Sequence, residues 1–427
     1  MKILLTWHSG MIGGVETWMV GMARALRALG QQAELFFFRR GLIAGHVPSD
    51  VRVHFGDLAE FLALTRAGAF DVVHAAVDDR DTGVSAVTWI GPRLVATVHG
   101  RVTPGWSSRN CDALVGCSRW CAEAQAAVTD LPVPVIVNGV DLDRFVPPDG
   151  PPRGPPVVAW VGRGADLEQK RIDRLAAIAP ALARAGVRVW VADPDGPSRA
   201  PCGLTAVLER VAERWSAVPV ESMAAFFQAV AASGGCVLST SAFEGLSMAY
   251  LEAQACGCPV LGPDVPGVRE GVDPSLGGLY SPHLTPEAAA EFVLAALRDR
   301  EGMARRRRAC RAFVAERFDF VTTARRYVEL YRRVVSVPRR ARRVWVIPPF
   351  TPAAVRRYVG DHWTPAVRQF EASQKLAARG DHWLAWRTFL SSLATCPSIY
   401  LRPRRLARLL RAAGTGATRH QPEVPVR

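Results

Sequence analysis

Residues 234–262 read GGCVLSTSAFEGLSMAYLEAQACGCPVLG, and this stretch decides the fold of the chain. Its apolar run at 236–238 predicts a buried strand, and the apolar residues after Gly245 recur at helical spacing. Gly257 suits a left-handed helix end, and the apolar run that follows it begins a second strand. The stretch therefore predicts a β-α-β unit whose ligand-facing loop lies at residues 243–247.

Two carboxylates stand in this unit, Glu244 and Glu252, and eight positions separate them. Side chains at that spacing do not point the same way from one helix. With Glu244 on the loop and Glu252 in the second helical turn, both can face the crevice beyond the strand ends, where doubly wound sheets bind ligands. The backbone amides of Gly245, Leu246 and Ser247 would then form a helix N-terminus, which attracts phosphate. Carboxylates for hydroxyl groups and amides for phosphate predict a nucleotide-sugar site.

The stretch resembles the signature of the family 4 glycosyltransferases, which have the GT-B fold and retain anomeric configuration. That signature holds two glutamates with seven residues between them, within E-G-(three or four residues)-L-E-A-x-A-x-G-x-P-V. The resemblance implies that Glu244 contacts the donor sugar and that Glu252 contacts the ribose hydroxyls. The alternative reading is two surface glutamates beside an ordinary core helix. The signature is matched at Glu244, Gly245, Leu251, Glu252, Ala253, Ala255, Gly257, Pro259 and Val260.

The length and composition are those of a globular protein with more than one domain. At 427 residues the chain exceeds one usual core, which predicts two domains and an appendage. The composition, 49% hydrophobic and 22% charged, is not that of a disordered chain. The nine cysteines are odd in number and lack the spacing of a disulfide framework. The close pairs Cys117/Cys121 and Cys256/Cys258 have no second pair or histidines at zinc spacing, so buried thiols are predicted and no metal site.

The N-terminal MKILLTWHSG is too short and too quickly polar for a secretion signal, and no apolar run approaches the roughly 18 residues that span a bilayer. We therefore expect a cytoplasmic protein. The net charge of +14 is concentrated near the C-terminus. Residues 301–427 hold 27 Lys and Arg against 8 Asp and Glu, whereas the first 300 residues hold 26 against 31. The basicity belongs to the tail and not to the body of the protein.

The N-terminal segment predicts a strand at 2–7, a glycine-containing loop, a helix from about 15 to 29 and a strand at 34–38. This order opens a dinucleotide-binding fold, but the loop SGMIGGVE lacks the G-x-G-x-x-G spacing, so a nicotinamide enzyme is disfavoured. Gly13 and Gly14 resemble the family's G-G-x-E loop, whose glycines let the backbone approach the donor phosphate or the acceptor. The alternative is an ordinary turn.

Further strands are predicted at 51–55, 71–74 and 94–98. The last would deliver His99 to the crevice, where an imidazole can hydrogen-bond a sugar hydroxyl or an incoming acceptor. The family often has a histidine here, so a functional role for His99 is favoured over a core position. His74 closes the preceding strand, and both readings stay open for it.

A proline-dense segment, PPDGPPRGPP at 147–156, has no hydrophobic periodicity and predicts a semi-rigid linker between domains. The NGVD before it resembles the end of the first GT-B domain, and the VVAWVG after it predicts a buried parallel strand. The family resemblance covers about residues 1–335. The predicted organisation is an acceptor domain at 1–146, the linker at 147–156, a nucleotide-sugar domain at 157–318, a crossover helix at 319–337 and a basic, Trp- and Arg-rich helical tail at 338–427.

Two cations follow the strand that opens the second domain, Arg163 and Lys170, and a strand at 216–220 and a helix at 223–231 are predicted downstream. The family uses V-G-R…K-G here to place two cations on the donor diphosphate. The leaving nucleoside diphosphate gains negative charge as the glycosidic bond breaks, and fixed cations stabilise that change, so no metal is implied. Arg171 stands where the family usually has glycine. The alternative is that both cations are merely solvated.

Towards the C-terminus the family pattern is lost, and arginine pairs alternate with aromatic residues. A helical hairpin is predicted at 380–413, with Trp383, Trp386, Leu390 and Leu393 on one face of its first arm. Arginine with tryptophan at this spacing fits attachment to an anionic membrane surface. The equal alternative is a helical cap packed on the enzyme body. Nucleic-acid binding is disfavoured, because no recognised binding motif accompanies the charge.

Together these features predict an α/β protein of two Rossmann-like domains that moves a sugar from a nucleoside-diphosphate sugar to an acceptor hydroxyl with retention. The catalytic candidates are His99, Arg163, Lys170 and Glu244. The nucleoside-diphosphate sugar is a co-substrate, and no separate cofactor or metal is implied. The acceptor would be lipid-linked, a polysaccharide or a metabolite, and the protein would be cytoplasmic or peripheral on the inner face of the membrane. The alternatives are a GT-B protein that has lost catalysis and serves as a binding partner or scaffold, and a GT-B nucleotide-sugar epimerase.

Overall fold

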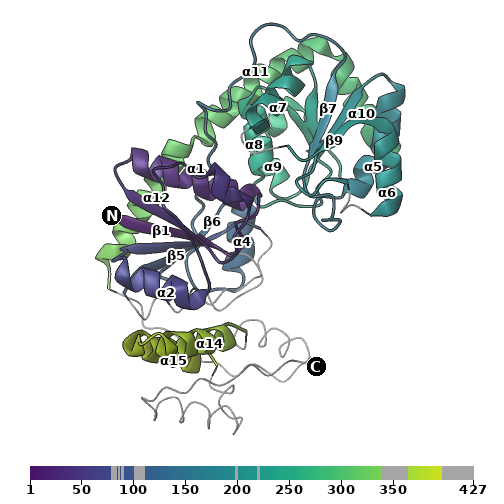
Figure 1. Cartoon of the computed structure of the whole chain (residues 1–427). Helices are drawn as coiled ribbons and strands as arrows, with labels where there is room; N and C mark the ends of the chain where they lie inside the picture. Colours follow the sequence, from purple (N-terminus) through teal and green to yellow (C-terminus); the bar gives the residue numbers. More distant parts are fainter. Residues whose placement is uncertain are drawn as a thin grey trace.

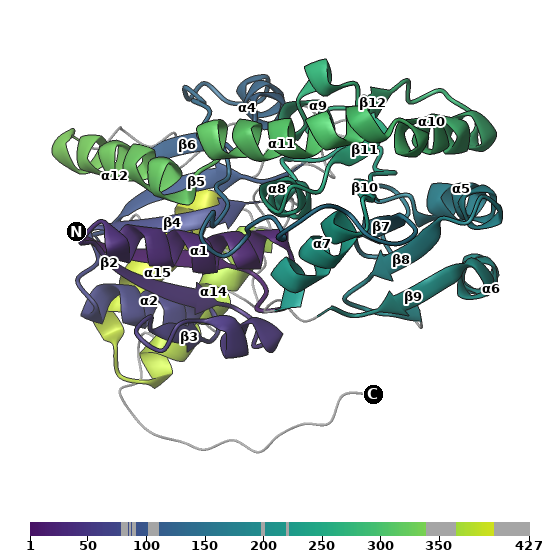
Figure 2. The same cartoon turned by 90° about the horizontal axis from the view of Figure 1, so that it is seen from above.

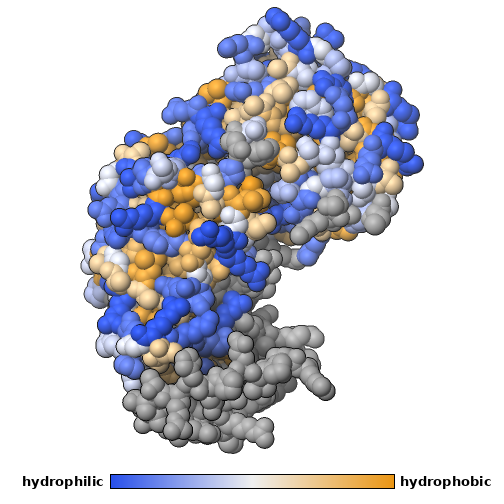
Figure 3. Space-filling model, viewed as in Figure 1, coloured by the Kyte–Doolittle hydropathy of each residue, from blue (hydrophilic) through white to orange (hydrophobic). Residues whose placement is uncertain are grey.

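The computed structural model describes residues 1–77, 84, 87, 91–100, 111–197, 201–218, 222–338 and 364–396. Two lobes are each built on a six-stranded parallel sheet with helices on both faces, and a helical hairpin lies against the first lobe (Figure 1). The predicted fold class, two Rossmann-like units with a C-terminal helical extension, is confirmed. On the face shown in Figure 3, hydrophobic and hydrophilic side chains are mixed over both lobes.

The first lobe has the strand order β3-β2-β1-β4-β5-β6, and every neighbouring pair is parallel. Its strands are apolar runs with few exposed positions, because helices cover both faces of the sheet. The strands are β1 (Lys2–Trp7), β2 (Gln32–Phe37), β3 (Val53–Phe55), β4 (Val72–Val77), β5 (Arg93–Val98) and β6 (Ala113–Gly116), and the helices include α1 (Gly14–Ala28), α2 (Leu58–Ala67) and α4 (Arg119–Ala126).

The second lobe has the order β12-β11-β10-β7-β8-β9. The chain adds β8 and β9 on one side of β7 and then β10, β11 and β12 on the other, so the order reverses between β7 and β10. Doubly wound sheets bind ligands outside the strand ends at such a reversal. The strands are β7 (Val157–Val161), β8 (Arg188–Ala192), β9 (Ala212–Ser216), β10 (Cys236–Leu238), β11 (Val260–Pro263) and β12 (Leu279–Tyr280), and the helices include α5 (Ile172–Arg184), α6 (Cys202–Val211), α7 (Met223–Ala232), α8 (Met248–Ala255), α9 (Val268–Gly271) and α10 (Pro286–Arg298).

The strand predicted at 216–220 is misplaced, because β9 ends at Ser216 and residues 219 and 220 lie outside the described part of the chain. In this sheet β9 is an edge strand with β8 as its only neighbour. Its middle residues, Glu213 and Arg214, can therefore stay exposed. Because polar residues interrupt β9, its sequence lacks the continuous apolar run from which a buried strand is predicted.

The chain returns to the first lobe through α11 (Arg300–Arg317) and α12 (Phe320–Ser336), which follow one another along one side of the molecule (Figure 2). The buried face of α12 packs on α1 and reaches the first sheet. The imidazole of His74 is hydrogen-bonded on both sides, to Tyr331 Oη at 2.5 Å and to Thr97 Oγ1 at 2.7 Å. Burial, with a smaller effect of His99, lowers the pKa of His74 to about 3. His74 is therefore a neutral core residue that ties α12 to the sheet.

The C-terminal extension is a hairpin of α14 (Thr364–Ala378) and α15 (His382–Thr395), which lies against α2 (Figures 1 and 2). The predicted first arm is α15, but its partner is the preceding helix, which the sequence reading missed. The predicted second arm lies outside the described residues. Among the described helices, none combines the length and the apolar character needed to cross a bilayer.

Candidate functional site

Two loops at the reversal of strand order in the second lobe are held together by three hydrogen bonds. One loop follows β7 and contains Gln169 and Lys170, and the other follows β10 and contains Thr240 and Ala242. Trp160 Nε1 donates to Thr240 Oγ1 at 2.8 Å, and that hydroxyl donates to the carbonyl oxygen of Lys170 at 2.7 Å. The amide of Ala242 donates to the carbonyl oxygen of Gln169 at 2.8 Å. The side chains that follow these strands therefore meet at one place.

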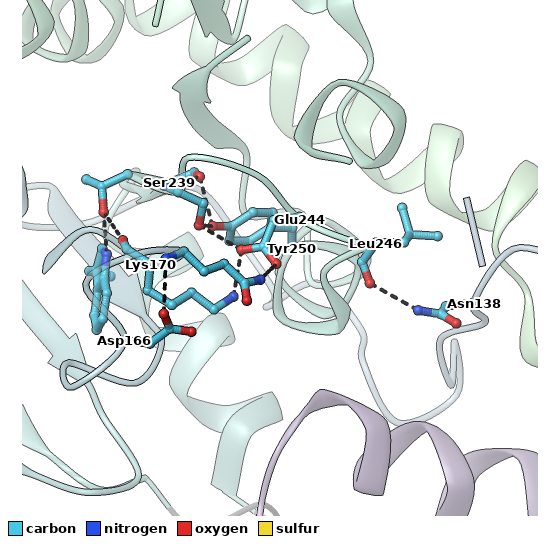
Figure 4. Close-up of polar contacts among 11 residues, drawn as sticks. Asn138, Asp166, Lys170, Ser239, Glu244, Leu246 and Tyr250 are labelled. Atoms are coloured by element: carbon cyan, nitrogen blue, oxygen red, sulfur yellow. Dashed lines mark hydrogen bonds and ion pairs between the residues drawn. The ribbon is translucent and has the colours of Figure 1, made fainter. Parts of the chain in front are cut away.

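Glu244 and Lys170 form a buried ion pair at this place (Figure 4). Lys170 Nζ lies 2.6 Å from Glu244 Oε1, and Ser241 Oγ donates to the same oxygen at 2.7 Å. The second oxygen accepts from Gln169 Nε2 at 2.9 Å. Glu244 is 3% exposed. The fold thus brings together two of the predicted site residues, which are far apart in the sequence.

The ion pair sits on a ring of hydroxyl groups that the sequence reading did not assign to the site. Tyr250 Oη donates to Ser239 Oγ at 2.8 Å and lies 3.2 Å from Ser241 Oγ. Burial disfavours the charged form of Lys170, but the carboxylate of Glu244 outweighs it, so the pKa of Lys170 is raised. Lys170 therefore stays cationic at neutral pH. Among these hydroxyl groups, that of Ser241 is the one that the sequence could have indicated, because Ser241 belongs to the same predicted loop region as Glu244.

Arg163 extends from the second lobe to the glycine loop of the first lobe. Its Nη2 donates to the carbonyl oxygen of Ile12 at 2.8 Å. A methyl group added to Gly13 would lie 3.0 Å from that nitrogen and 2.7 Å from Glu16 Oε2, so glycine leaves the space that the guanidinium uses. Gly14 begins α1 and faces Met248 at an ordinary contact distance. The two predicted glycines therefore lie beside Arg163 and the start of α8.

Arg171 has a left-handed backbone, with φ 52° and ψ 51°, at the position where the family usually has glycine. Glycine adopts this conformation without strain, whereas residues with a Cβ atom do not. The guanidinium of Arg171 is held by both carboxylate oxygens of Asp173, at 3.0 and 2.8 Å. The departure from the family pattern thus leaves the backbone turn, and the position of Lys170 before it, in place.

The helix predicted to start at Gly245 starts instead at Met248, with Ser247 as its N-cap residue. Gly245 and Leu246 remain outside the helix because they contact the first lobe. A side-chain carbon on Gly245 would overlap the carbonyl oxygen of His99, and the carbonyl oxygen of Leu246 accepts from Asn138 Nδ2 at 3.0 Å (Figure 4). The N-terminus of this helix therefore lies later than predicted: Gly245 and Leu246 precede it, and Ser247 is its N-cap residue. The amides of Ser247 and Met248 stand at this end of the helix.

His99 follows β5 and packs its ring against Trp18, with ring centroids 4.5 Å apart. Its Nε2 atom is buried and has no hydrogen-bond partner among the described residues. Burial lowers the pKa of His99 to about 3, so the imidazole is neutral at physiological pH. In this form it can hydrogen-bond a hydroxyl group, but it is a weak base.

Glu252 lies on α8 and does not face the Lys170–Glu244 pair. It lines a cavity of about 520 Å³ between α1 and α8. Met248 lines the same cavity, so the space begins at the start of the helix. Burial raises the pKa of Glu252 to about 8, and the positive charge of Arg144 offsets part of this rise. Neither Glu244 nor Lys170 is among the described residues that line this cavity. Glu252 on α8 and Glu244 on the loop before it thus face different spaces.

Glu270, which lies in α9, also joins the two lobes. Its carboxylate accepts from the amides of Arg119, at 2.5 Å, and Trp120, at 2.8 Å, at the N-terminus of α4. A carboxylate is favourable at this end of a helix, where unpaired amides and the helix dipole meet.

Two family models match the chain, one in each lobe. The model described as "Glycosyltransferase Family 4" matches residues 12–144, and the model described as "Glycosyl transferases group 1" matches residues 155–299. Together they span more than half of the chain and both sides of the site.

Curated relatives agree with these models. A D-inositol 3-phosphate glycosyltransferase of Jonesia denitrificans is 25% identical over 394 residues, which cover 76% of this chain and 92% of the relative. One of Segniliparus rotundus is 33% identical over 170 residues, but the match covers 36% of this chain and 37% of that relative. A glycogen synthase of Mycobacterium tuberculosis is 28% identical over 287 residues, which cover 63% and 65% of the two chains.

Solved structures share the fold. HepE of Anabaena, in complex with UDP and glucose, matches with a TM-score of 0.60 at 20% identity and covers 77% of this chain and 99% of its own. Sucrose-phosphate synthase of Thermosynechococcus elongatus matches with a TM-score of 0.62 at 18% identity and covers 78% and 98%. At these identities the likeness concerns the fold and not the substrate.

Proposed function

Because the chain belongs to the family 4 glycosyltransferases of the GT-B fold, we propose that it transfers a sugar from a nucleoside-diphosphate sugar to an acceptor hydroxyl with retention of configuration. The observation that carries the proposal is the Lys170–Glu244 pair at the reversal of strand order, with Arg163 reaching the glycine loop nearby. Cations and a carboxylate at one crevice supply partners for a diphosphate and for sugar hydroxyls.

In our proposal the donor lies along the start of α8. The diphosphate contacts the free amides at Met248, together with Arg163 and Lys170, because helix N-termini and cations both favour phosphate. The nucleoside occupies the cavity beside Glu252, whose carboxyl group takes the ribose hydroxyls. A volume of about 520 Å³ is in the usual range of roughly 300–1,000 Å³ for small-molecule sites. The sugar then lies towards Glu244.

The chemistry follows from charge development. As the bond between the sugar and the diphosphate breaks, negative charge grows on the leaving oxygen, and Arg163 and Lys170 stabilise it. The acceptor hydroxyl attacks from the face that the diphosphate leaves, and its proton goes to the departing phosphate. We propose that the two cations take the part that a metal ion plays in other glycosyltransferases. His99, which is neutral, holds a hydroxyl group by a hydrogen bond rather than acting as a base.

Donor and acceptor classes can be ordered for testing from the relatives. HepE binds UDP and glucose, so uridine diphosphate sugars are the first donors to test, with guanosine and adenosine analogues as the comparison. The curated relatives act on D-inositol 3-phosphate or make glycogen, so inositol phosphates and glucans join lipid-linked acceptors in the panel.

Kinetics of three variants test the site assignment. Glu244→Gln and Arg163→Ala should lower kcat by on the order of 10²-fold, because each removes a contact to the reacting sugar or its leaving group. Glu252→Gln should mainly weaken nucleotide binding and raise KM for the donor. The matched control is Glu287→Gln, an exposed glutamate at the start of α10. Unaltered kinetics in all three variants would refute the assignment.

Product analysis separates the remaining alternatives. A scaffold protein that has lost catalysis would neither transfer the sugar nor hydrolyse the donor, although the intact ion pair counts against this reading. An epimerase would convert the nucleotide sugar without any acceptor. Chromatography of the donor incubated with and without acceptor distinguishes all three outcomes.

A further inference from the structure

The exposed and buried faces of α15 are the reverse of those expected for a surface helix. Its exposed face carries Trp383, Trp386, Leu390 and Leu393, which are 45%, 55%, 39% and 36% exposed. These positions recur at helical spacing and form one stripe. The opposite face is buried and, apart from Leu384, holds small and hydroxyl-bearing side chains, namely Ala385, Thr388, Ser391, Ser392 and Thr395. A stripe of large apolar side chains facing outward marks an interaction surface.

The packing of α15 on α14 explains how this arrangement is held. Gln369 of α14 is fully buried, and its Oε1 accepts from Ser391 Oγ at 3.2 Å and from Thr395 Oγ1 at 3.1 Å. Small residues and hydroxyl–amide hydrogen bonds at a helix contact are typical of helices whose outer faces meet apolar surroundings. The hairpin therefore does not use its apolar stripe for its own folding.

The attachment of the hairpin to the first lobe also leaves the stripe uncovered. Lys375 Nζ lies 2.5 Å from Asp57 Oδ2, and Arg379 Nη2 lies 3.6 Å from Glu60 Oε1. These exposed ion pairs lie at the edge of a buried apolar contact in which Ala372, Leu376 and Leu384 of the hairpin pack in the core of the first lobe. Trp383, at the start of the stripe, contacts the first lobe, where Arg66 lies 4.4 Å from its ring centroid.

The charge around the stripe indicates what covers it. The helix α15 contains Arg387 and no acidic residue. In the sequence, residues 339–363 hold six arginines and one acidic residue, and residues 397–427 hold seven arginines and one acidic residue. Tryptophan and leucine beside many arginines match the interface of a membrane that contains anionic lipids.

We propose that the stripe Trp383, Trp386, Leu390 and Leu393 docks the protein on an anionic lipid surface. The helix lies in the plane of the interface, with the stripe among the acyl chains and with Arg66 and Arg387, which both contact the ring of Trp383, near the lipid phosphates. None of the described helices is suited to cross the bilayer, so the attachment is peripheral. The proposal does not depend on the donor site, because the hairpin packs on α2 and not on the second lobe.

Sedimentation of the full-length protein with vesicles tests the proposal. The vesicles contain phosphatidylcholine with or without phosphatidylglycerol, and the variant is Trp386→Ser/Leu390→Ser, which leaves Trp383 and its arginine contact intact. We expect the partition coefficient of the variant onto anionic vesicles to fall about tenfold or more, because binding scales with the apolar area inserted. The matched control is Leu42→Ser, an apolar residue on the first lobe that is 64% exposed.

Three results would overturn the proposal. The unchanged protein could fail to sediment with anionic vesicles, or the variant could sediment as well as the unchanged protein, which would assign binding to the arginines without the stripe. The variant could also lose an oligomeric state in light scattering with no effect on vesicle binding, which would assign the stripe to a second copy of the chain. Sugar transfer to a soluble acceptor should be equal in both proteins, so a failure of the proposed function is seen separately.

Discussion

At the scale of single residues, the ion pair of Lys170 and Glu244 is buried, and the carboxylate of Glu244 is hydrogen-bonded at both oxygens. Glu244 has three hydrogen-bonding partners, Lys170, Gln169 and Ser241. A buried pair of this kind costs about 3–5 kcal/mol when one partner is removed, because the other charge is left without compensation. The ammonium group of Lys170 has three N–H donors, so in our proposal it binds a diphosphate oxygen while it keeps its contact with Glu244.

The strained turn at Arg171 gives a stability prediction. Arg171→Gly should raise the free energy of unfolding by about 0.5 kcal/mol, because relief of a left-handed Cβ conformation outweighs the loss of an ion pair with Asp173 that is more than one-third exposed. Urea denaturation measures the change. Arg171→Ala is the matched control, since it loses the ion pair but keeps the strain, and it should not stabilise. Equal effects of both substitutions would show that the backbone conformation is not the cause.

The carboxyl group of Glu252, which is partly buried at the wall of the cavity, gives a prediction about pH. Burial raises its pKa from the ordinary value of 4.5 to about 8, so the folded protein holds this proton more tightly than the unfolded chain. The stabilisation is complete below pH 4.5 and is lost as the pH rises through about 8. Without donor, the unfolding free energy of Glu252→Gln should therefore decrease less between pH 5 and pH 8 than that of the unchanged protein. Parallel decreases in urea denaturation at the two pH values would count against a partly buried, protonated Glu252.

At the scale of elements, the sequence predicts strands and helices well where both faces are buried. The strand at 2–7 and the helix at 223–231 come within a residue of β1 and α7. The start of α8 was missed because Gly245 and Leu246 are held by His99 and Asn138, which belong to the other lobe. The hydrophobic periodicity of a short stretch of sequence does not indicate contacts with another lobe. The same holds for the ring of hydroxyl groups under Glu244, which comes together only when two loops meet.

The helix α14 was missed for a related reason. Its buried face holds two large apolar side chains, Phe370 and Leu376, beside the polar Gln369 and Ser373, so it lacks the run of large apolar residues that drew attention to α15. Conversely, the apolar stripe of α15 was recognised, but its direction could not be read. Which face a helix buries depends on the partner, and here the partner was the helix that the pattern did not reveal.

The close contact at Gly245 gives a prediction for the element that joins the lobes. Gly245→Ala should push the lobes apart, because the added carbon would overlap the carbonyl oxygen of His99. We expect kcat/KM to fall by roughly 10²-fold, since a misplaced closing element disturbs the reacting geometry. The radius of gyration in small-angle scattering should increase. Gly203→Ala in α6, which has open space around it, is the control, and a Gly245→Ala protein with unchanged kinetics and size would contradict the close contact.

At the scale of the whole molecule, the two lobes are held closed by contacts from several elements. Arg163 reaches the glycine loop, Asn138 reaches the start of α8, and Glu270 caps α4. The helix α12 then returns the chain to the first lobe and is fixed there through His74 and Tyr331. In the function that we propose, closure of this kind would bring acceptor and donor together and exclude water, which hydrolyses the donor. The hairpin lies outside this arrangement, against α2.

The central claim is that a nucleoside diphosphate binds between the lobes at the start of α8. Diffraction from crystals soaked with the diphosphates of uridine, guanosine and adenosine tests it most directly. We predict density for at least one of them, with its phosphates within hydrogen-bonding distance of Arg163 and Lys170 and its ribose beside Glu252. Density for a nucleotide away from these three residues, or a cleft that stays empty with all three compounds, would contradict the account.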